Sequence, residues 1–194
     1  MSALTTRQAA HFEALYASTP DPWHVRDAWY EQRKRTLLLA CLPQARYANA
    51  FEPGCGNGEL SAALALRCAR LLACDGSASA VAAGRERVAG QAHVTIEQRH
   101  LPQDWPDDIG AFDLVVVSEL AYYFPAEEWQ AMMARIVATL APGGLLLMCH
   151  CRHPYDDYLT SADFVHATAH AAPQLKACVH YLESDFLIDG WLRA

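Results

Sequence analysis

A glycine-rich segment with an acid at its start carries the clearest chemical signal in this chain. It reads Glu52-Pro53-Gly54-Cys55-Gly56-Asn57-Gly58. Glycine has no Cβ, so the backbone at these positions can approach a ligand closely and can turn sharply. A carboxylate at Glu52 would repel a pyrophosphate and attract an ammonium group. The segment therefore favours a ligand with a positive charge, although the glycines alone are also compatible with a simple strand-to-helix turn.

A second acid follows at the distance expected for a ribose-binding residue. Asp75 lies 17 residues after Gly58, at the end of the apolar run 71–74. A carboxylate at that place can accept hydrogen bonds from both hydroxyls of a ribose. The glycine spacing differs from the dinucleotide pattern GxGxxG because the third glycine arrives one residue early. The two acids together indicate a ligand that carries both a ribose and an ammonium group.

Three more candidates for chemistry stand just beyond apolar runs. Glu119 follows the run 112–117, and Tyr122 comes three residues later. His150 follows the run 145–149. A carboxylate or an imidazole can accept a proton, and an aromatic face suits a developing cation. The alternatives are that Glu119 caps the next segment or pairs with a base, and that His150 is bound by a backbone carbonyl.

Histidine and cysteine follow the run 145–149 directly, and two more histidines come one helical turn apart further along. Together they raise the alternative of a zinc site. The members are His150, Cys151, His153, His166 and His170. Neighbouring side chains at a strand end point to opposite faces, so we expect no metal there. The seven cysteines lack CxxC pairs, which favours buried, reduced thiols.

Hydrophobic periodicity predicts the elements that position these residues. Helices are expected at 5–18, 26–42, 59–69, 77–89 and 125–140, and strands at 48–51, 71–74, 94–97, 112–117, 145–149, 175–182 and 186–192. Strands that alternate with helices predict a parallel sheet. Only three residues separate the last two strands, so these form an antiparallel hairpin.

Length and composition restrict the class of protein. The chain has 194 residues, of which 53% are hydrophobic, and this suits one globular domain. Its formal net charge of −7 disfavours a nucleic-acid partner. We find no signal peptide and no apolar run long enough to span a membrane, so a cytoplasmic location is expected.

The motifs in their order resemble those of class I S-adenosylmethionine-dependent methyltransferases. The segment 52–58 and Asp75 resemble the cofactor motifs, 112–119 the motif of the fourth strand, and 140–144 the turn before the fifth strand. The resemblance implies an α/β, Rossmann-like, doubly wound sheet of seven strands in the order 3-2-1-4-5-7-6, with strand 7 antiparallel. The two helices expected at 5–18 and 26–42 precede the first strand of this sheet. It also implies S-adenosyl-L-methionine as the cofactor.

The resemblance assigns roles to particular residues. Glu52 would face the methionine ammonium, the backbones of Gly54 and Gly56 would border the methionyl group, and Asp75 would hold the ribose. The expected cofactor-binding set is completed by Gly58, Gly76 beside the adenine, His100 and Leu101 after the third strand, and Ser118. The aromatic residues of the N-terminal helices would lie over the cofactor, with Trp23 and Tyr30 as contacts.

A narrower resemblance links Asp21-Pro22-Trp23, the segment 30–34 and the segment 118–123 to the nodulation S (NodS) N-methyltransferases. It implies N-methylation of an amino sugar or a similar small amine. From their places at or just after the carboxyl ends of strands, we expect Glu119, Tyr122 and His150 to be the catalytic residues. We expect residues 1–43 to form a helical lid on a core of residues 44–194, in a monomer or homodimer. An O-methyltransferase, an NAD-dependent oxidoreductase and a noncatalytic binding module stay as alternatives, and the role of residues 152–173 is open.

Overall fold

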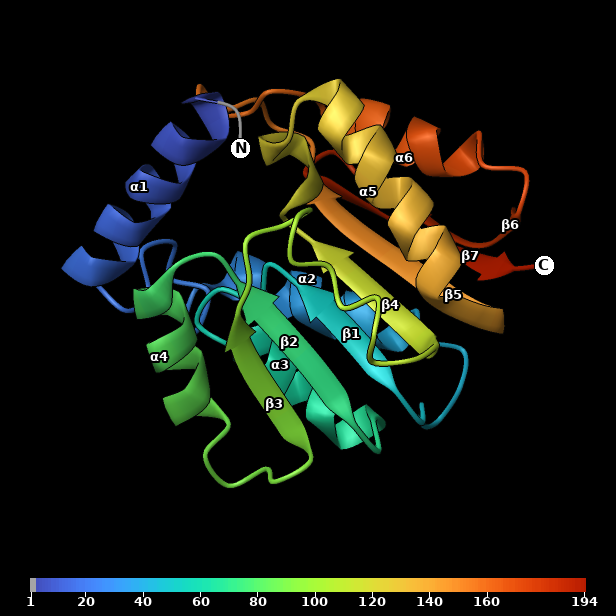
Figure 1. Cartoon of the computed structure of the whole chain (residues 1–194), viewed down its shortest axis with the longest axis horizontal. Helices are drawn as coiled ribbons and strands as arrows, with labels where there is room; N and C mark the ends of the chain where they lie inside the picture. The colour runs from blue at the N-terminus through green and yellow to red at the C-terminus, as the bar shows by residue number, and fades with distance from the viewer. Residues whose placement is uncertain (1–2) are drawn as a thin grey trace.

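A mixed sheet of seven strands organises the molecule, with the order β3-β2-β1-β4-β5-β7-β6 (Figure 1). The computed structural model describes residues 3–194; Met1 and Ser2, the first residues of the predicted lid, lie outside the described residues. The strands are β1 (Ala50–Pro53), β2 (Leu71–Asp75), β3 (Val94–Gln98), β4 (Phe112–Ser118), β5 (Leu140–Cys151), β6 (Leu175–Leu182) and β7 (Phe186–Arg193). β7 runs antiparallel to both β5 and β6, whereas the other neighbours are parallel. The predicted strand order and the reversed last strand are confirmed.

Helices cover both faces of the sheet. They are α1 (Ala3–Ser18), α2 (Trp29–Ala40), α3 (Glu59–Leu64), α4 (Ala78–Arg87), α5 (Ala126–Thr139) and α6 (Ala162–His170), with 3₁₀ turns η1 (Ala65–Arg67) and η2 (Ala121–Tyr123). Figure 1 shows α5 and α6 on one face and α2 and α3 behind the sheet. α1 stands beyond the strand ends and contacts α4.

The central strands β4 and β5 are mostly apolar because helices cover them on both sides. In β5, Leu146 and Met148 belong to a core cluster with Val165 of α6, while Leu147 packs in a second cluster with Leu38 of α2. Each fully buried side chain of this kind stabilises the fold by about 1.5–3 kcal/mol. This double coverage explains why the runs 112–117 and 145–149 lack the alternation of a strand with one exposed face.

Several element boundaries differ from the sequence prediction. The second helix begins at Trp29, because backbone N–H groups of the preceding turns bind the side chain of Asp21 instead. The third ends at Leu64 and tightens into η1. β5 begins at Leu140 and so includes residues 142–144, which were predicted as a turn, with a register shift against β4.

Helix α6 was not predicted, although its start carries a recognisable signal. The Ser161 hydroxyl accepts a hydrogen bond from the Phe164 N–H, as an N-cap does. The predicted cap at Ser77 is confirmed in the same way, because its Oγ accepts from the Ala80 N–H at 3.0 Å. All seven cysteines lie in the described part of the chain and are free thiols; five of them are buried.

Within residues 3–194, none of the helices combines the length and the apolar character needed to cross a membrane.

Candidate active site

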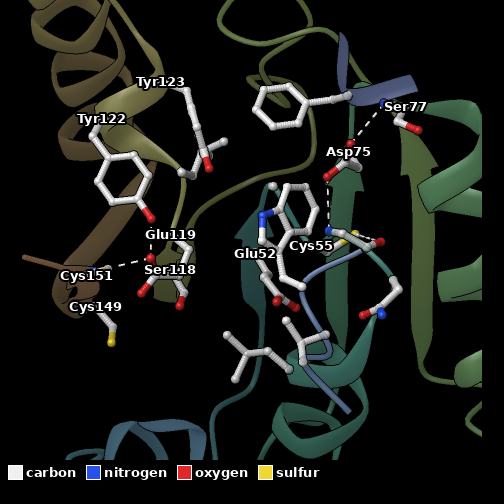
Figure 2. Close-up of a pocket in the computed structure, with 18 of the residues that line it drawn as sticks. Glu52, Cys55, Asp75, Ser77, Ser118, Glu119, Tyr122, Tyr123, Cys149 and Cys151 are labelled. Atoms are coloured by element: carbon white, nitrogen blue, oxygen red, sulfur yellow. Dashed lines mark hydrogen bonds between the residues drawn. The ribbon is translucent and has the colours of Figure 1, made fainter. Parts of the chain in front are cut away.

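A cavity of about 440 Å³ opens at the carboxyl ends of the strands, and its walls come from distant parts of the chain. Figure 2 shows two groups of side chains across it, with Asp75 and Ser77 on one side and Glu119 and Tyr122 on the other. Nine of the twelve predicted site residues line the cavity, namely Glu52, Gly54, Gly56, Asp75, Gly76, Leu101, Ser118, Glu119 and Tyr122. The described lining does not include Gly58, His100 or His150. The volume is in the range of small-ligand sites.

The glycine loop brings bare backbone to the cavity wall. Gly54 and Gly56 have φ angles of 73° and 53°, in the left-handed region that favours glycine. A Cβ at Gly54 would lie 2.7 Å from a methyl group of Leu120, and one at Gly56 would collide with the Tyr16 hydroxyl. Any larger residue would therefore fill the space beside the backbone of Gly54 and Gly56, which we call the cradle.

Asp75 joins this loop to the end of β2. Its Oδ2 accepts a hydrogen bond from the Gly56 N–H at 3.0 Å, and its Oδ1 accepts from the Ser77 N–H at 2.9 Å (Figure 2). Burial raises the pKa of Asp75 despite these bonds, which act in the opposite direction. Each carboxylate oxygen can accept more than one hydrogen bond, so the group can still receive hydroxyls from a ligand.

Glu52 is a buried acid that receives a hydroxyl rather than a cation. It is 2% exposed, and its Oε2 accepts from the Ser61 Oγ at 2.6 Å. Burial raises its pKa to about 8, and the negative charge of Asp75 adds to the shift. Among the described residues no cationic side chain forms an ion pair with Glu52. A ligand ammonium would supply that missing charge.

Two residues of the predicted cofactor set serve the scaffold instead of lining the cavity. Gly58 has a φ of 78°, and a Cβ there would lie 2.9 Å from the Cα of Gly84, so it lets the start of α3 approach α4. His100 lies beside Gly76, and its backbone N–H donates to Asp104 Oδ2 at 2.9 Å. The sequence placed both near the ligand because each flanks a residue that does line the cavity.

The other side of the cavity centres on Glu119. This residue has a φ of 54°, unusual for a side chain with a Cβ, and it directly follows β4. Its Oε2 accepts hydrogen bonds from the Tyr122 hydroxyl and from the Cys151 N–H at 3.3 Å (Figure 2). Its Oε1 lies 3.0 Å from the Nζ of Lys34. Three donors therefore already surround this carboxylate.

Lys34 and Glu31 of α2 complete this side, and the sequence prediction missed both as site residues. Lys34 is 5% exposed, its Nζ lies 2.9 Å from Glu31 Oε1, and the same atom sits 4.7 Å above the Tyr30 ring. Burial alone would lower the pKa of Lys34, but Glu119 and Glu31 outweigh it and raise that pKa. Burial raises the pKa of Glu31 against the opposing effect of Lys34. The spacing of Lys34 four residues before the buried Leu38 is a sequence signal that could have found it.

Aromatic rings wall the cavity between the two sides. The Tyr122 and Tyr158 rings stack with centroids 3.7 Å apart, and Tyr123 meets Phe12 of α1 edge to face at 4.8 Å. Trp23 and Tyr30, the two aromatic contacts expected from the N-terminal helices, both line the cavity. Phe12 and Tyr158 were not predicted, because nothing local to either places it near Tyr122.

His150 is fully buried on the α5/α6 side of β5, away from the cavity lining. Its Nε2 accepts from the Ala121 N–H at 3.2 Å, and its Nδ1 lies 2.9 Å from His166 Nε2. His150 therefore does not reach the cavity, although the sequence prediction put it beside the acceptor. His153 points elsewhere, toward Asp185 at 3.0 Å. Within residues 3–194 no group of three or more His, Cys, Asp or Glu is arranged to hold a metal ion.

Comparison with known proteins shows that the chain is similar to methyltransferases. Residues 50–144 match the sequence profile of a methyltransferase domain. A presumed methyltransferase from Pseudomonas syringae, known from its crystal structure, is 44% identical; the match covers 86% of this chain and 100% of that one, with a TM-score of 0.76. The N-methyltransferase NodS of Bradyrhizobium japonicum, solved with S-adenosyl-L-homocysteine, has a TM-score of 0.84 at 24% identity and covers 95% of this chain and 97% of its own.

Among curated proteins, the nodulation protein S of Rhizobium tropici is 32% identical over 134 residues, which is 68% of this chain and 56% of that protein. The chain spans little more than half the length of the curated relatives that it matches.

Proposed function

The chain belongs to the class I S-adenosylmethionine-dependent methyltransferases, and from that premise we propose that it methylates the amine of a small acceptor, an amino sugar or a similar metabolite. The observation that carries the choice of an amine is the pair of carboxylates, Glu31 and Glu119, around the single ammonium of Lys34. The three groups together carry a formal net charge of −1, which would attract a cationic acceptor.

The cradle fits the methyl donor of this family. Glu52 would hold the methionine ammonium, the bare backbone of Gly54 and Gly56 would border the methionyl group, and Asp75 would hold the ribose hydroxyls. Gly76 and Leu101 line the part of the cavity beyond Asp75, where the adenine would lie, and Ser118 faces the reacting end. Bound S-adenosylmethionine supplies an electrophilic methyl group on a sulfonium.

On the side of the cavity where the acceptor would bind, Glu119 and Glu31 have different roles. Glu119 already receives Lys34, Tyr122 and the Cys151 N–H, so its remaining acceptor direction orients the amine. Glu31, bound to Lys34 through one oxygen, takes the proton that the amine must lose before its lone pair can attack carbon. The buried position that raises the pKa of Glu31 makes it a better base than an exposed carboxylate.

The aromatic walls exclude water and align the reactants, which supplies much of the rate in an in-line displacement. The ring faces of Tyr122, Tyr123 and Tyr158 suit both a sugar ring and a developing cation. NodS of Bradyrhizobium japonicum is named an N-methyltransferase, and this supports an amine over a hydroxyl acceptor.

The proposal keeps residues 1–43 as a helical lid on a core of residues 44–194. Glu13 of α1 accepts hydrogen bonds from the hydroxyls of Ser77 and Ser79 at 2.7 and 2.6 Å. The Asn57 side chain of the glycine loop donates to Asp21 Oδ1 at 3.0 Å. Polar side-chain contacts of this kind can open and close at α1 and the turn after it, whereas Leu38 holds α2 on the core. A cytoplasmic location and a monomeric or dimeric state stay predictions.

A label-transfer screen with matched acceptors tests the proposed function. The purified chain would be incubated with methyl-labelled S-adenosylmethionine and glucosamine oligomers, their N-acetylated forms or glucose oligomers. We expect label only in the free-amine series, with mass spectrometry placing the methyl group on nitrogen. Label in the hydroxyl-only acceptors would make the protein an O-methyltransferase. No label in any acceptor, with S-adenosylhomocysteine still bound, would favour a noncatalytic binding module.

Glu31→Gln tests the proposed base within the same assay. We expect kcat to fall about 100-fold, a usual contribution of general-base catalysis. The affinity for S-adenosylhomocysteine should stay the same because Glu52 and Asp75, not Glu31, hold that ligand. A kcat equal to that of the unchanged protein would remove Glu31 from the mechanism.

A further inference from the structure

A line of buried side chains connects the turn that carries Glu119 and Tyr122 to β7, the strand next to the edge of the sheet. It runs from the Ala121 N–H to His150 Nε2 at 3.2 Å, from His150 Nδ1 to His166 Nε2 at 2.9 Å, and from His166 Nδ1 to Asp189 Oδ2 at 2.7 Å. His150, His166 and Asp189 are each at most 2% exposed. We propose that these three are positioning residues that hold the turn at residues 119–123 through a hydrogen-bond chain with one fixed direction. Their catalytic consequence rests on the proposed function.

The direction follows from the two ends of the chain. A backbone N–H can only donate, so His150 Nε2 must be an unprotonated acceptor. Neutral His150 then carries its hydrogen on Nδ1 and donates to His166 Nε2. His166 in turn carries its hydrogen on Nδ1 and donates to the Asp189 carboxylate. One donor at one end and one anion at the other therefore determine both tautomers.

The anionic end is held by further histidines at the surface. Asp189 Oδ1 lies 2.6 Å from Nδ1 of His180, a side chain that is 66% exposed. The Trp191 indole N–H donates to His170 Nδ1 at 3.2 Å, so the hydrogen of a neutral His170 is on Nε2, 3.8 Å from Asp189 Oδ2. Burial alone would raise the pKa of Asp189, but His166 and His180 outweigh it and lower that pKa. The carboxylate therefore stays ionised and keeps the direction of the chain.

The turn at the other end needs such an anchor. Glu119 adopts a left-handed backbone conformation, which costs conformational energy for a residue with a Cβ. Ala121 begins η2, and the hydroxyl of the next residue, Tyr122, donates to Glu119. The His150 ring also meets the Tyr122 ring edge to face at 5.2 Å. Holding the Ala121 N–H thus sets both side chains on the acceptor side of the cavity.

A proton added to His166 would reverse the donor and acceptor roles along the hydrogen-bond chain. If His166 Nε2 gains a hydrogen, it becomes a donor, and His150 must accept on Nδ1 and move its own hydrogen to Nε2. That hydrogen would face the Ala121 N–H, donor against donor, and the anchor would be lost. His150 contacts His166 and the Tyr122 ring, and the charge of Lys34 also acts on it. His166 contacts Asp189, and the charges of His170 and Asp163 also act on it. Burial lowers the pKa of both His150 and His166, so the anchored form prevails at neutral pH.

Imidazole ¹⁵N NMR on the full-length polypeptide tests the direction of the hydrogen-bond chain directly. Long-range ¹H–¹⁵N spectra between pH 6 and 8 should show His150 and His166 as neutral rings with hydrogen on Nδ1. Free histidine in water prefers the Nε2 form, so the result is diagnostic. Either ring found in the Nε2–H form or protonated at pH 7 would overturn the proposal. This measurement needs no acceptor, so it stands or fails separately from the proposed function.

A matched pair of variants tests whether the hydrogen-bond chain positions the turn at residues 119–123. Asp189→Asn keeps an acceptor for His166 and can donate to His180, so the tautomers and kcat should stay within about threefold of the unchanged protein. Asp189→Leu removes the acceptor, and we expect exchange of the Ala121 amide to speed up at least tenfold. We also expect kcat to fall at least tenfold, with S-adenosylhomocysteine affinity changed less than twofold. Equal kcat and equal Ala121 exchange in the two variants would overturn the positioning role, and the ring tautomers of the unchanged protein decide the case if Asp189→Leu does not fold.

Discussion

The two sides of the cavity handle buried negative charge in opposite ways. On the side of the glycine loop, Glu52 and Asp75 receive a hydroxyl and backbone N–H groups, and burial raises the pKa of both. On the other side, Glu31 and Glu119 share the ammonium of Lys34. A buried carboxylate without a cation gains most from a cationic ligand, whereas a paired carboxylate is already stabilised. The first side is therefore suited to bind a cation tightly, and the second to exchange a weaker ligand.

The two sides of the cavity also differ in how far apart along the sequence their residues lie. The glycine loop and the two acids of the first side all lie between positions 52 and 75, within one βαβ unit. The second side combines α2, the end of β4, the end of β5 and Tyr158. Its geometry depends on packing across the whole sheet, so a change there should disturb stability more than ligand affinity.

Removal of the shared cation should give the largest effect. Lys34→Met would leave two half-buried carboxylates beside each other without their cation, and we expect the free energy of unfolding to fall by about 3 kcal/mol, the lower end of the range for fully buried pairs. Urea unfolding at pH 7 measures this loss. Adding Glu31→Gln and Glu119→Gln to Lys34→Met removes the repelling charges and should restore at least half of it. A loss below about 1 kcal/mol in the single variant would show that the three charges are well hydrated.

Asp75→Ala should act on the ligand instead. It removes charge-assisted hydrogen bonds worth roughly 1.5–3 kcal/mol, so S-adenosylhomocysteine affinity should fall about 10- to 150-fold in calorimetry. Glu119→Gln is the matched control from the opposite side and should change that affinity less than twofold. If the two variants weaken binding equally, the division of the cavity into two sides is wrong.

The pH dependence of ligand binding gives the smallest and most specific test. Glu52 has a pKa of about 8 without ligand, so it is mostly protonated at pH 6 and 7. An ammonium ligand binds the ionised form and lowers that pKa, so the complex holds fewer protons than the free protein. Affinity for S-adenosylhomocysteine should therefore rise roughly tenfold from pH 6 to pH 7 and level off near pH 8.

Calorimetry in two buffers of different ionisation enthalpy should detect the release of about one proton on binding at pH 6.5. Glu52→Gln should abolish both the release and the pH dependence. Flat affinity in the unchanged protein would mean that Glu52 does not meet the ligand ammonium.

Prediction from sequence put residues at the cavity where the pattern is local. Glu52, Gly54, Gly56 and Asp75 could be recognised because strand ends and glycine spacing place them at one edge of the sheet whatever the rest of the chain does. Gly58 belongs to the same segment, yet its role is the close approach of α3 to α4. Only the packing of Gly84 against it reveals this.

Prediction was weaker where partners come from distant elements. Lys34 and Glu31 belong to the segment 30–34, where spacing can put Lys34 on the same helix face as Leu38 but cannot show its partners. Only the packing of α2 beneath β4 and β5 brings the two residues beside Glu119. His150 stood at a strand end like Glu119, but it lies on the opposite face of the sheet. The neighbours of a side chain at a strand end depend on which helix covers its face.

The sequence by itself determined the alternation of strands and helices, the reversed last strand and the acids of the glycine-loop side, because these follow from hydrophobic period, turn residues and short-range spacing. The tertiary structure alone decided how charge is distributed on the acceptor side, the burial of His150 and the direction of its hydrogen-bond chain. Burial and pairing are set by contacts between residues such as Lys34 and Glu119, or His150 and Asp189, that are far apart along the chain. No local pattern encodes such contacts, since each exists only after the sheet has formed and the helices have packed on it.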